Sequence, residues 1–168
     1  SAAGDDPLVL FGRWLDDAVT AQIHEPNAMA LATSTPDGRP SVRIVLLKGL
    51  DESGMTFFTN YESRKGGELE ANPRAAAVLL WHPLQRQVRV EGPVTRVASD
   101  ESDAYFHSRP HGSQLGALAS PQSSVIADRA TLDARYEAAA ESHGEGDVPR
   151  PDHWGGYRIE LHSIEFWQ

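Results

Sequence analysis

The sequence predicts an α+β fold in which antiparallel strands form a barrel with helices at its ends. Short runs rich in β-branched residues, separated by turns, fill most of the first hundred residues. Helical patterns follow over residues 99–108 and 127–142, and a last strand-like segment covers residues 157–167. Strands, then a helical insertion, then a returning strand are typical of an α+β fold and not of alternating βαβ units.

The first helix is expected over residues 6–23, where apolar residues recur at near-helical spacing. Asp6 is the candidate N-cap, and Pro7 stands at the first helical position, where its missing N–H is tolerated. Such an amphipathic helix commonly packs its apolar face on a sheet.

A meander of strands comes next, bounded by turns that contain Asp, Gly and Pro. A short helix over residues 63–71, closed by Asn72-Pro73, separates the third strand from the fourth. In the fifth strand, polar and apolar residues alternate with a period of two, so one face is polar. The expected strands cover residues 28–33, 41–50, 55–60, 75–81 and 87–97.

Beyond the meander, helices are expected over residues 99–108 and 127–142. A loop rich in Gly and Pro, residues 142–151, follows them. The final strand is expected over residues 157–167.

Length and composition limit the function classes. A chain of 168 residues suits one domain, residues 1–168, with a core of its own. The absence of cysteine excludes disulfides and thiolate metal sites and fits a reducing compartment. No apolar run approaches the ~20 residues of a membrane span, and Ser1–Asp6 does not resemble a signal peptide. We therefore expect a soluble, cytoplasmic protein.

The formal net charge of −9 opposes binding to nucleic acid. In an acidic protein, a local group of Arg and Lys is held against the general field, which indicates an anionic ligand. Two such basic clusters occur.

The first basic cluster covers residues 60–67. Ser63 is a candidate helix N-cap, and Arg64 and Lys65 add positive charge to the helix start. This assembly suits a phosphate monoester. A capped surface helix with two solvated bases would have the same local sequence.

The second basic cluster covers residues 105–113. Tyr105 and Arg109 lie four residues apart on one helix face, and Pro110 ends the helix and turns Ser113 back toward it. A phenol, a guanidinium and a hydroxyl could bind a second phosphate. An ordinary helix end is the alternative.

One expected strand segment, residues 43–48, has an apolar middle and a positive charge at each end. Its ends, Arg43 and Lys48, have opposite parity and should point to opposite faces unless a bulge intervenes. Because buried strands avoid uncompensated charge, both ends should have anionic partners.

Other site chemistries find no support in the sequence. None of the seven histidines forms an HExxH pattern, and the close pair His107 and His111 is interrupted by Pro110. No P-loop, GxGxxG or GxSxG motif is present. We therefore expect no metal site, no nucleoside triphosphate site and no serine triad.

Taken together, the segments resemble the pyridoxamine 5′-phosphate oxidase family along nearly the whole chain. Each motif is short, and their shared order and spacing make the resemblance specific. The motifs are Glu25-Pro26-Asn27-Ala28-Met29, Arg43-Ile44-Val45-Leu46-Leu47-Lys48, Phe57-Phe58-Thr59-Asn60, Ser63-Arg64-Lys65, Arg86-Gln87-Val88, Tyr105-Phe106-His107-Ser108-Arg109-Pro110, Ser113-Gln114-Leu115-Gly116-Ala117, Gln122-Ser123, Trp154-Gly155-Gly156-Tyr157-Arg158 and Ile164-Glu165-Phe166-Trp167-Gln168.

The resemblance implies an FMN-binding split β-barrel with flanking helices, which works as a homodimer and buries two FMN molecules at its interface. It also implies that Lys48, Tyr105, Arg109 and Ser113 bind the phosphate of a vitamin B6 substrate. The residues implied to hold FMN, partly from the second subunit, are Arg43, Ile44, Val45, Leu46, Leu47, Lys48, Phe58, Thr59, Ser63, Arg64, Lys65, Gln87, Gln122, Ser123 and Trp167.

The implied reaction makes pyridoxal 5′-phosphate from pyridoxamine or pyridoxine 5′-phosphate. Hydride passes from C4′ of the substrate to flavin N5, and O2 reoxidises the flavin with release of H2O2. No catalytic side chain is implied, because the flavin carries the chemistry and the protein orients the two rings.

Two alternatives stay open: a related flavin oxidase of the phenazine type, and a non-catalytic split-barrel protein that binds flavin, haem or another cofactor. Members of the family usually continue past the Phe-Trp-Gln motif with an Arg-x-His pair and a further Arg. They also tend to carry an N-terminal arm, whereas the printed sequence starts near the first helix and stops at Gln168.

Overall fold

The structure is a computed structural model that describes residues 6–168. The expectation about a signal peptide falls largely on residues 1–5, which lie outside the described ones. The chain forms two compact units. The described part of unit 1 comprises residues 6–57, 68–95 and 157–168, and unit 2 comprises residues 58–67 and 96–156. That residues 1–168 form a single domain stays a prediction.

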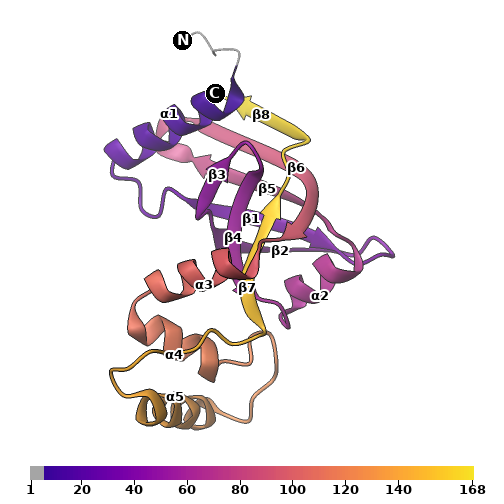
Figure 1. Cartoon of the computed structure of the whole chain (residues 1–168). Helices are drawn as coiled ribbons and strands as arrows, with labels where there is room; N and C mark the ends of the chain where they lie inside the picture. The colour runs from indigo at the N-terminus through magenta and orange to yellow at the C-terminus, as the bar shows by residue number, and fades with distance from the viewer. Residues whose placement is uncertain (1–5) are drawn as a thin grey trace. The chain divides into compact units, whose positions relative to one another are not determined.

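The described residues form an antiparallel sheet of eight strands (Figure 1). The strand order is β2-β1-β5-β6-β7-β4-β3, and β8 pairs with β6. The strands are β1 (Ala28–Ser34), β2 (Pro40–Leu46), β3 (Gly49–Asp51), β4 (Gly54–Asn60), β5 (Arg74–Trp81), β6 (Arg86–Arg96), β7 (Trp154–Ile159) and β8 (Ser163–Trp167).

Helices flank this sheet, so the predicted α+β split-barrel fold is confirmed. A short 3-10 turn, His82–Leu84, connects β5 to β6. No helix among the described residues is long and apolar enough to cross a membrane. The helices are α1 (Pro7–Thr20), α2 (Arg64–Ala71), α3 (Ser99–Ser108), α4 (His111–Ala119) and α5 (Arg129–His143).

Helix α1 begins as the sequence predicts. The Asp6 carboxylate accepts a hydrogen bond of 2.8 Å from the Leu8 N–H, and Pro7 occupies the first turn. The helix buries its apolar face in unit 1, where Phe11 lies 6.0 Å from the Trp81 ring. It ends at Thr20, before the predicted Ile23, because Gln22 adopts a positive φ of 54°.

The segment predicted as one strand over residues 41–50 is two strands, β2 and β3. The Leu47 N–H donates to the Asn27 carbonyl at 2.9 Å, while the next N–H, of Lys48, donates to the Thr56 carbonyl at 2.8 Å. The chain therefore changes partner strands at this point. Lys48 lies between two strands, so the parity argument, which assumed one continuous strand from Arg43, does not apply to it.

The segment predicted as one strand over residues 157–167 also divides, into β7 and β8. Between them, the Glu160 N–H donates to the Pro93 carbonyl at 2.9 Å, and the His162 N–H donates to the Glu91 carbonyl at 3.2 Å. A Cβ on Gly92 would lie 1.7 Å from the Glu160 carbonyl oxygen. Gly92 therefore lets the chain cross close to β6 before it returns as β8.

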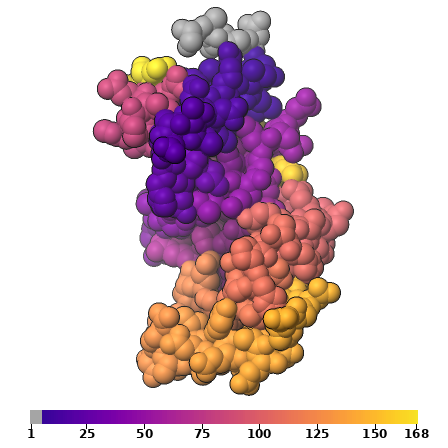
Figure 2. All heavy atoms as spheres, turned by 90° about the vertical axis from the view of Figure 1, so that its left-hand side faces the viewer, coloured from indigo at the N-terminus to yellow at the C-terminus, as the bar shows by residue number. Residues whose placement is uncertain are grey.

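Helix α4 was not predicted. Its sequence, HGSQLGALA, contains two glycines, which lower helix propensity by about 1 kcal/mol each. Tertiary packing stabilises this helix despite its low propensity, because Leu115 is buried with Phe106, Val148 and Trp154 in a hydrophobic cluster. In Figure 2, the coral and orange atoms belong to unit 2.

Candidate functional site

The first basic cluster is assembled in unit 2 around the Lys65 side chain, which is only 8% exposed. Its Nζ atom donates to the Thr59 Oγ1 at 2.9 Å, the Gln122 Oε1 at 2.9 Å and the Ser63 Oγ at 3.2 Å. The structure thus brings together four of the residues that the sequence resemblance assigned to FMN. They come from strand β4, from the start of helix α2 and from the loop after helix α4.

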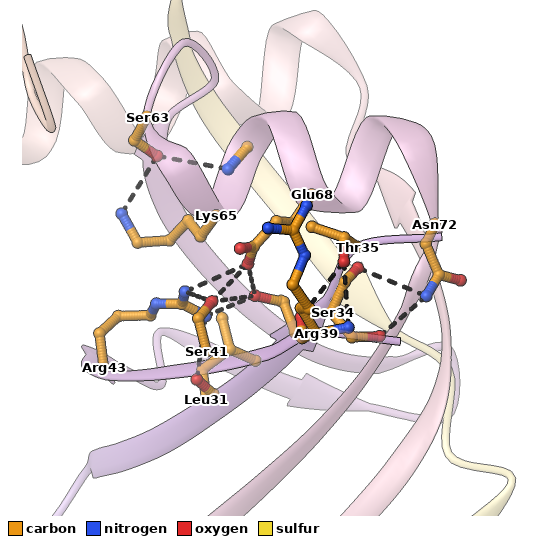
Figure 3. Close-up of polar contacts among 12 residues, drawn as sticks. Leu31, Ser34, Thr35, Arg39, Ser41, Arg43, Ser63, Lys65, Glu68 and Asn72 are labelled. Carbon is orange, nitrogen blue, oxygen red and sulfur yellow. Dashed lines mark hydrogen bonds and ion pairs between the residues drawn. The ribbon is translucent and has the colours of Figure 1, made fainter. Parts of the chain in front are cut away.

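Local capping explains how this cluster forms. The Ser63 hydroxyl accepts the Gly66 N–H at 3.3 Å, which is the expected N-cap contact, and it donates to the Asn60 carbonyl at 2.6 Å. Lys65 therefore stands in the first turn of α2, where the helix dipole is positive, and Figure 3 shows it beside Ser63. Arg64, the first residue of the helix, is exposed.

A buried ammonium, two hydroxyls and the start of a helix are a set of groups that binds a phosphate monoester. The residues of the first basic cluster thus fit the phosphate of a flavin mononucleotide. The adjoining Ser123 adopts a positive φ of 67° in the exposed loop that also carries Gln122. A serine in this backbone region is uncommon and is often found at binding sites.

The second basic cluster lies on helix α3, also in unit 2. The Tyr105 ring stacks on Phe58 with centroids 4.0 Å apart, and the Arg109 guanidinium lies 4.6 Å from the Trp154 ring centroid. The Arg109 Nη1 atom is buried and has no hydrogen-bond partner among residues 6–168. Because a buried charged donor is costly to leave unsatisfied, this atom indicates a place for an anion.

The environment of Arg109 is partly desolvated. Burial lowers the pKa of Arg109, and its interaction with the Tyr105 phenol opposes that shift. Arginine still stays protonated at neutral pH, because its reference value is so high. The side chain therefore presents a weakly hydrated positive charge, which suits phosphate binding.

Ser113 is not brought into this group. It lies exposed in the first turn of α4, where its N–H donates to the Pro110 carbonyl at 2.8 Å. No hydrogen bond joins its side chain to Tyr105 or Arg109 in the part of the chain that the structure describes. The remaining member of the predicted substrate set, Lys48, belongs to unit 1 and is exposed.

In unit 1, Arg43 is bound by an internal carboxylate (Figure 3). Its guanidinium donates to the Leu31 carbonyl at 3.1 Å, to the Thr33 hydroxyl at 2.6 Å and to the Ser41 hydroxyl, and it lies 3.4 Å from the Glu68 carboxylate. Glu68 is the anionic partner that the sequence required for this end of the strand. Which of these groups would also meet a flavin stays a prediction.

Glu68 itself was missed by sequence reasoning. It is 6% exposed and accepts 2.5 Å hydrogen bonds from both Thr33 and Ser41. A signal was present, because Ser41 and Arg43 share one strand face and Thr33 pairs with Ser41 in the β1–β2 register. A polar patch on neighbouring strands needs an anionic partner if it is to be buried.

The other predicted flavin residues of unit 1 lie along β2 and at the β6–β8 pair. Gln87 and Trp167 are cross-strand neighbours in the antiparallel register, and Trp167 is 63% exposed. Val45 and Leu47 are buried in unit 1, Leu46 is half-buried and Ile44 is exposed. Residues 6–168 contain no group of three or more His, Asp or Glu that could hold a metal ion.

A family profile described as pyridoxamine 5′-phosphate oxidase matches residues 15–143, which is most of the chain. The chain belongs to this family. The pyridoxine/pyridoxamine 5′-phosphate oxidase of Salinibacter ruber is 55% identical over 165 residues, which are 98% of this chain and 77% of the relative. The corresponding protein of Cupriavidus pinatubonensis is 58% identical over 168 residues, or 100% of this chain and 79% of the relative.

Two solved structures have a similar fold. PhzG from Burkholderia lata 383, solved in complex with tetrahydrophenazine-1-carboxylic acid, matches with a TM-score of 0.93 at 34% identity, covering 98% of this chain and 81% of PhzG. A pyridoxamine 5′-phosphate oxidase-related, FMN-binding protein from Nostoc punctiforme matches with a TM-score of 0.73 at 16% identity. The match covers 96% of this chain and 84% of the Nostoc protein. The second likeness concerns the fold alone. The resemblance predicted from the sequence motifs is confirmed.

Proposed function

We propose that this member of the family is an FMN-dependent pyridoxamine/pyridoxine 5′-phosphate oxidase. The observation that carries the proposal is the buried Arg109 Nη1 atom without a hydrogen-bond partner among the described residues. A substrate with a phosphate group would supply the missing acceptor. The relatives that share more than half of their residues with this chain are named for phosphate-bearing substrates.

FMN would be held through its phosphate by the first basic cluster. Ser63, Arg64 and Lys65 would bind the phosphate, and Thr59 and Gln122, which already contact Lys65, would complete this end of the site. When bound, the flavin would accept a hydride from the substrate, and O2 would restore it with release of H2O2. The protein would bind and orient the two ring systems and exclude water.

The substrate phosphate would lie at the second basic cluster. Arg109 and Tyr105 would provide a charged and a neutral donor, and Lys48 and Ser113 would add further contacts in the loaded enzyme. The substrate loses a proton from its amine or hydroxyl together with the hydride, and this proton would pass to water, so no side chain needs to act as a strong base.

We further propose a cytoplasmic homodimer, in which each chain completes the flavin pocket of the other. One face of the unit 1 sheet supports this, because it exposes the apolar side chains Val42, Ile44, Leu80 and Trp167 beside the charged Arg89, Glu91 and Glu165. The β5–β6 and β6–β8 registers place Leu80, Gln87 and Trp167 in one row across three strands. Apolar surface of this kind commonly marks a protein interface.

A visible spectrum of the purified protein, followed by anaerobic mixing with pyridoxamine 5′-phosphate, tests the proposal. An oxidase would be yellow and would bleach on mixing, and air would restore its colour. A protein that stays yellow under these conditions would be a binder of flavin without this activity. Sedimentation that finds a flavin-bound monomer would contradict the proposed dimer.

A phenazine-type oxidase is the second candidate, because PhzG matches this chain with a TM-score of 0.93. The same anaerobic experiment with tetrahydrophenazine-1-carboxylic acid separates the two activities. Bleaching by the phenazine compound and not by pyridoxamine 5′-phosphate would decide for this alternative. The unpartnered Arg109 atom needs an anion, which either a phosphate or the carboxylate of the phenazine compound could supply. The relatives at 55% and 58% identity, which are named for phosphate-bearing substrates, favour the first candidate.

A further inference from the structure

Three nearly parallel aromatic rings form a stack in unit 2. Phe58 and Tyr105 lie 4.0 Å apart at 19°, Phe58 and Trp154 lie 5.6 Å apart at 12°, and Tyr105 and Trp154 lie 6.1 Å apart at 7°. A fourth ring, Phe106, meets Trp154 edge-on at 5.1 Å. Trp154 therefore contacts both aromatic residues of the helix segment that leads to Arg109.

Trp154 also provides the face on which the Arg109 guanidinium rests. The Arg109 Cζ atom lies 4.6 Å from the Trp154 ring centroid and 5.6 Å from the Phe106 centroid. Tryptophan is the strongest partner for such a cation–π contact, and the contact strengthens when water is excluded. This arrangement stabilises the charge without using the N–H groups, so the buried Nη1 atom stays open for an anion.

The backbone of Trp154 is attached to the same helix that carries Arg109. Arg150 donates from Nη1 to the Trp154 carbonyl at 2.6 Å, from Nε to the Asp103 carboxylate at 2.6 Å and from Nη2 to the Ser99 hydroxyl at 2.7 Å. Asp103 and Ser99 belong to α3, and Arg109 is the C-cap of that helix. One guanidinium thus fixes the position of Trp154 relative to α3.

The residues after Trp154 restrict its position further. A Cβ on Gly155 would lie 2.1 Å from the Tyr61 hydroxyl, and a Cβ on Gly156 would lie 2.8 Å from the Phe58 ring. Both glycines allow the chain to pass against neighbouring side chains of unit 2. Arg150 therefore fixes the backbone carbonyl of Trp154, and the close packing of the two glycines restricts the chain that follows it.

We propose that Trp154 is a positioning residue that holds Arg109 ready for the phosphate of the ligand and so favours phosphorylated over unphosphorylated substrates. The identity of that ligand as a vitamin B6 phosphate rests on the proposed function. The positioning of Arg109 by Trp154 does not rest on the proposed function, because this positioning depends only on contacts within unit 2.

A double-mutant cycle on the flavin-loaded protein tests this proposal. The variants are Trp154→Leu, Trp154→Phe, Arg109→Ala and the double variant Trp154→Leu/Arg109→Ala. Calorimetry measures binding of pyridoxal 5′-phosphate and, separately, of inorganic phosphate, so that no turnover is needed. We expect Trp154→Leu to weaken binding about three- to thirtyfold, and Trp154→Phe to restore most of the loss, because it keeps a ring face.

In the Arg109→Ala background, Trp154→Leu should change the affinity by less than about twofold, because the residue that it positions is gone. An equal loss in both backgrounds would show a general structural role and overturn the proposal. So would an unchanged affinity of Trp154→Leu, or a wild-type protein that binds neither phosphate probe.

A matched control separates positioning from loss of core packing. Val148 belongs to the same hydrophobic cluster as Trp154 but has no aromatic ring to offer the Arg109 guanidinium. Val148→Ala should therefore lower thermal stability and leave phosphate affinity within about twofold of wild type. If Val148→Ala weakened phosphate binding as much as Trp154→Leu does, the proposal would be wrong. A protein that binds phosphate in the predicted way but does not oxidise pyridoxamine 5′-phosphate would refute only the proposed oxidase activity.

Discussion

Substitution of Lys65 by methionine should reduce FMN affinity while sparing riboflavin. Methionine keeps the length of the side chain and removes the buried ammonium that contacts Thr59, Ser63 and Gln122. A hydrogen bond to a charged group contributes about 1.5–3 kcal/mol, so one lost contact with the phosphate corresponds to a weakening of about 10- to 150-fold in Kd.

The assay is quenching of flavin fluorescence during titration of the apoprotein with FMN and with riboflavin, which lacks the phosphate. The affinity for riboflavin should fall by less than about threefold in Lys65→Met, because the contact that Lys65 would make is with the phosphate. Arg13→Met is the matched control, since it removes one exposed positive charge from helix α1 of unit 1 and should change FMN affinity by less than about twofold. An unchanged Kd for FMN, or equal losses for both flavins, would refute the assignment of Lys65 to the phosphate.

Three further predictions concern an ion pair, the second basic cluster and the pH dependence of stability. Glu68→Gln should lower the free energy of unfolding in urea by about 3–5 kcal/mol, because it leaves the Arg43 charge without its buried partner. Arg109→Ala should raise the KM for pyridoxamine 5′-phosphate about ten- to a hundredfold, as measured by oxygen uptake. The hydrogen bond from Arg150 holds the pKa of Asp103 below its usual value of 3.8. The stabilisation from this carboxylate is therefore fully present above that value and is lost as pH falls through the lower, folded-state pKa, so Asp103→Asn and wild type should converge in acid-unfolding curves.

Each of these predictions has an outcome that contradicts it. For the ion pair, an apolar double variant that is no more stable than Glu68→Gln would show that the buried charge is not the cause of the loss. For Arg109, an unchanged KM would remove its assignment to the substrate phosphate. For Asp103, a stability difference that persists undiminished below the folded-state pKa would exclude ionisation as its source.

Local signals in the sequence predicted the elements that local chemistry controls. Asp6 and Pro7 define the start of α1, and Ser63 caps α2, because side-chain caps act within one helical turn. The grouping of Lys65 with Gln122 came from the family resemblance and not from spacing, since 57 residues separate them. Their contact depends on the tertiary fold.

The elements that sequence reasoning missed are those that depend on distant partners. The exchange of partner strands at Leu47 and Lys48 has only a weak local signal, Gly49, because a single glycine in a strand pattern also fits a bulge in a continuing strand. Helix α4 forms from a glycine-containing segment through packing of Leu115. Glu68 lies on an ordinary helical stretch, and only the folded strands reveal Arg43 and two hydroxyls around it.

The exposed apolar side chains on one face of the unit 1 sheet would link cofactor retention to protein concentration if the protein forms the proposed dimer. In the proposed dimer, association covers Trp167 and its neighbour Gln87, which are also assigned to the flavin pocket. FMN binding would then favour association of the two chains, and association would favour FMN binding, because both events stabilise the same arrangement of Gln87 and Trp167. Dilution would release FMN, and added FMN would hold the dimer together at concentrations where the apoprotein separates into single chains.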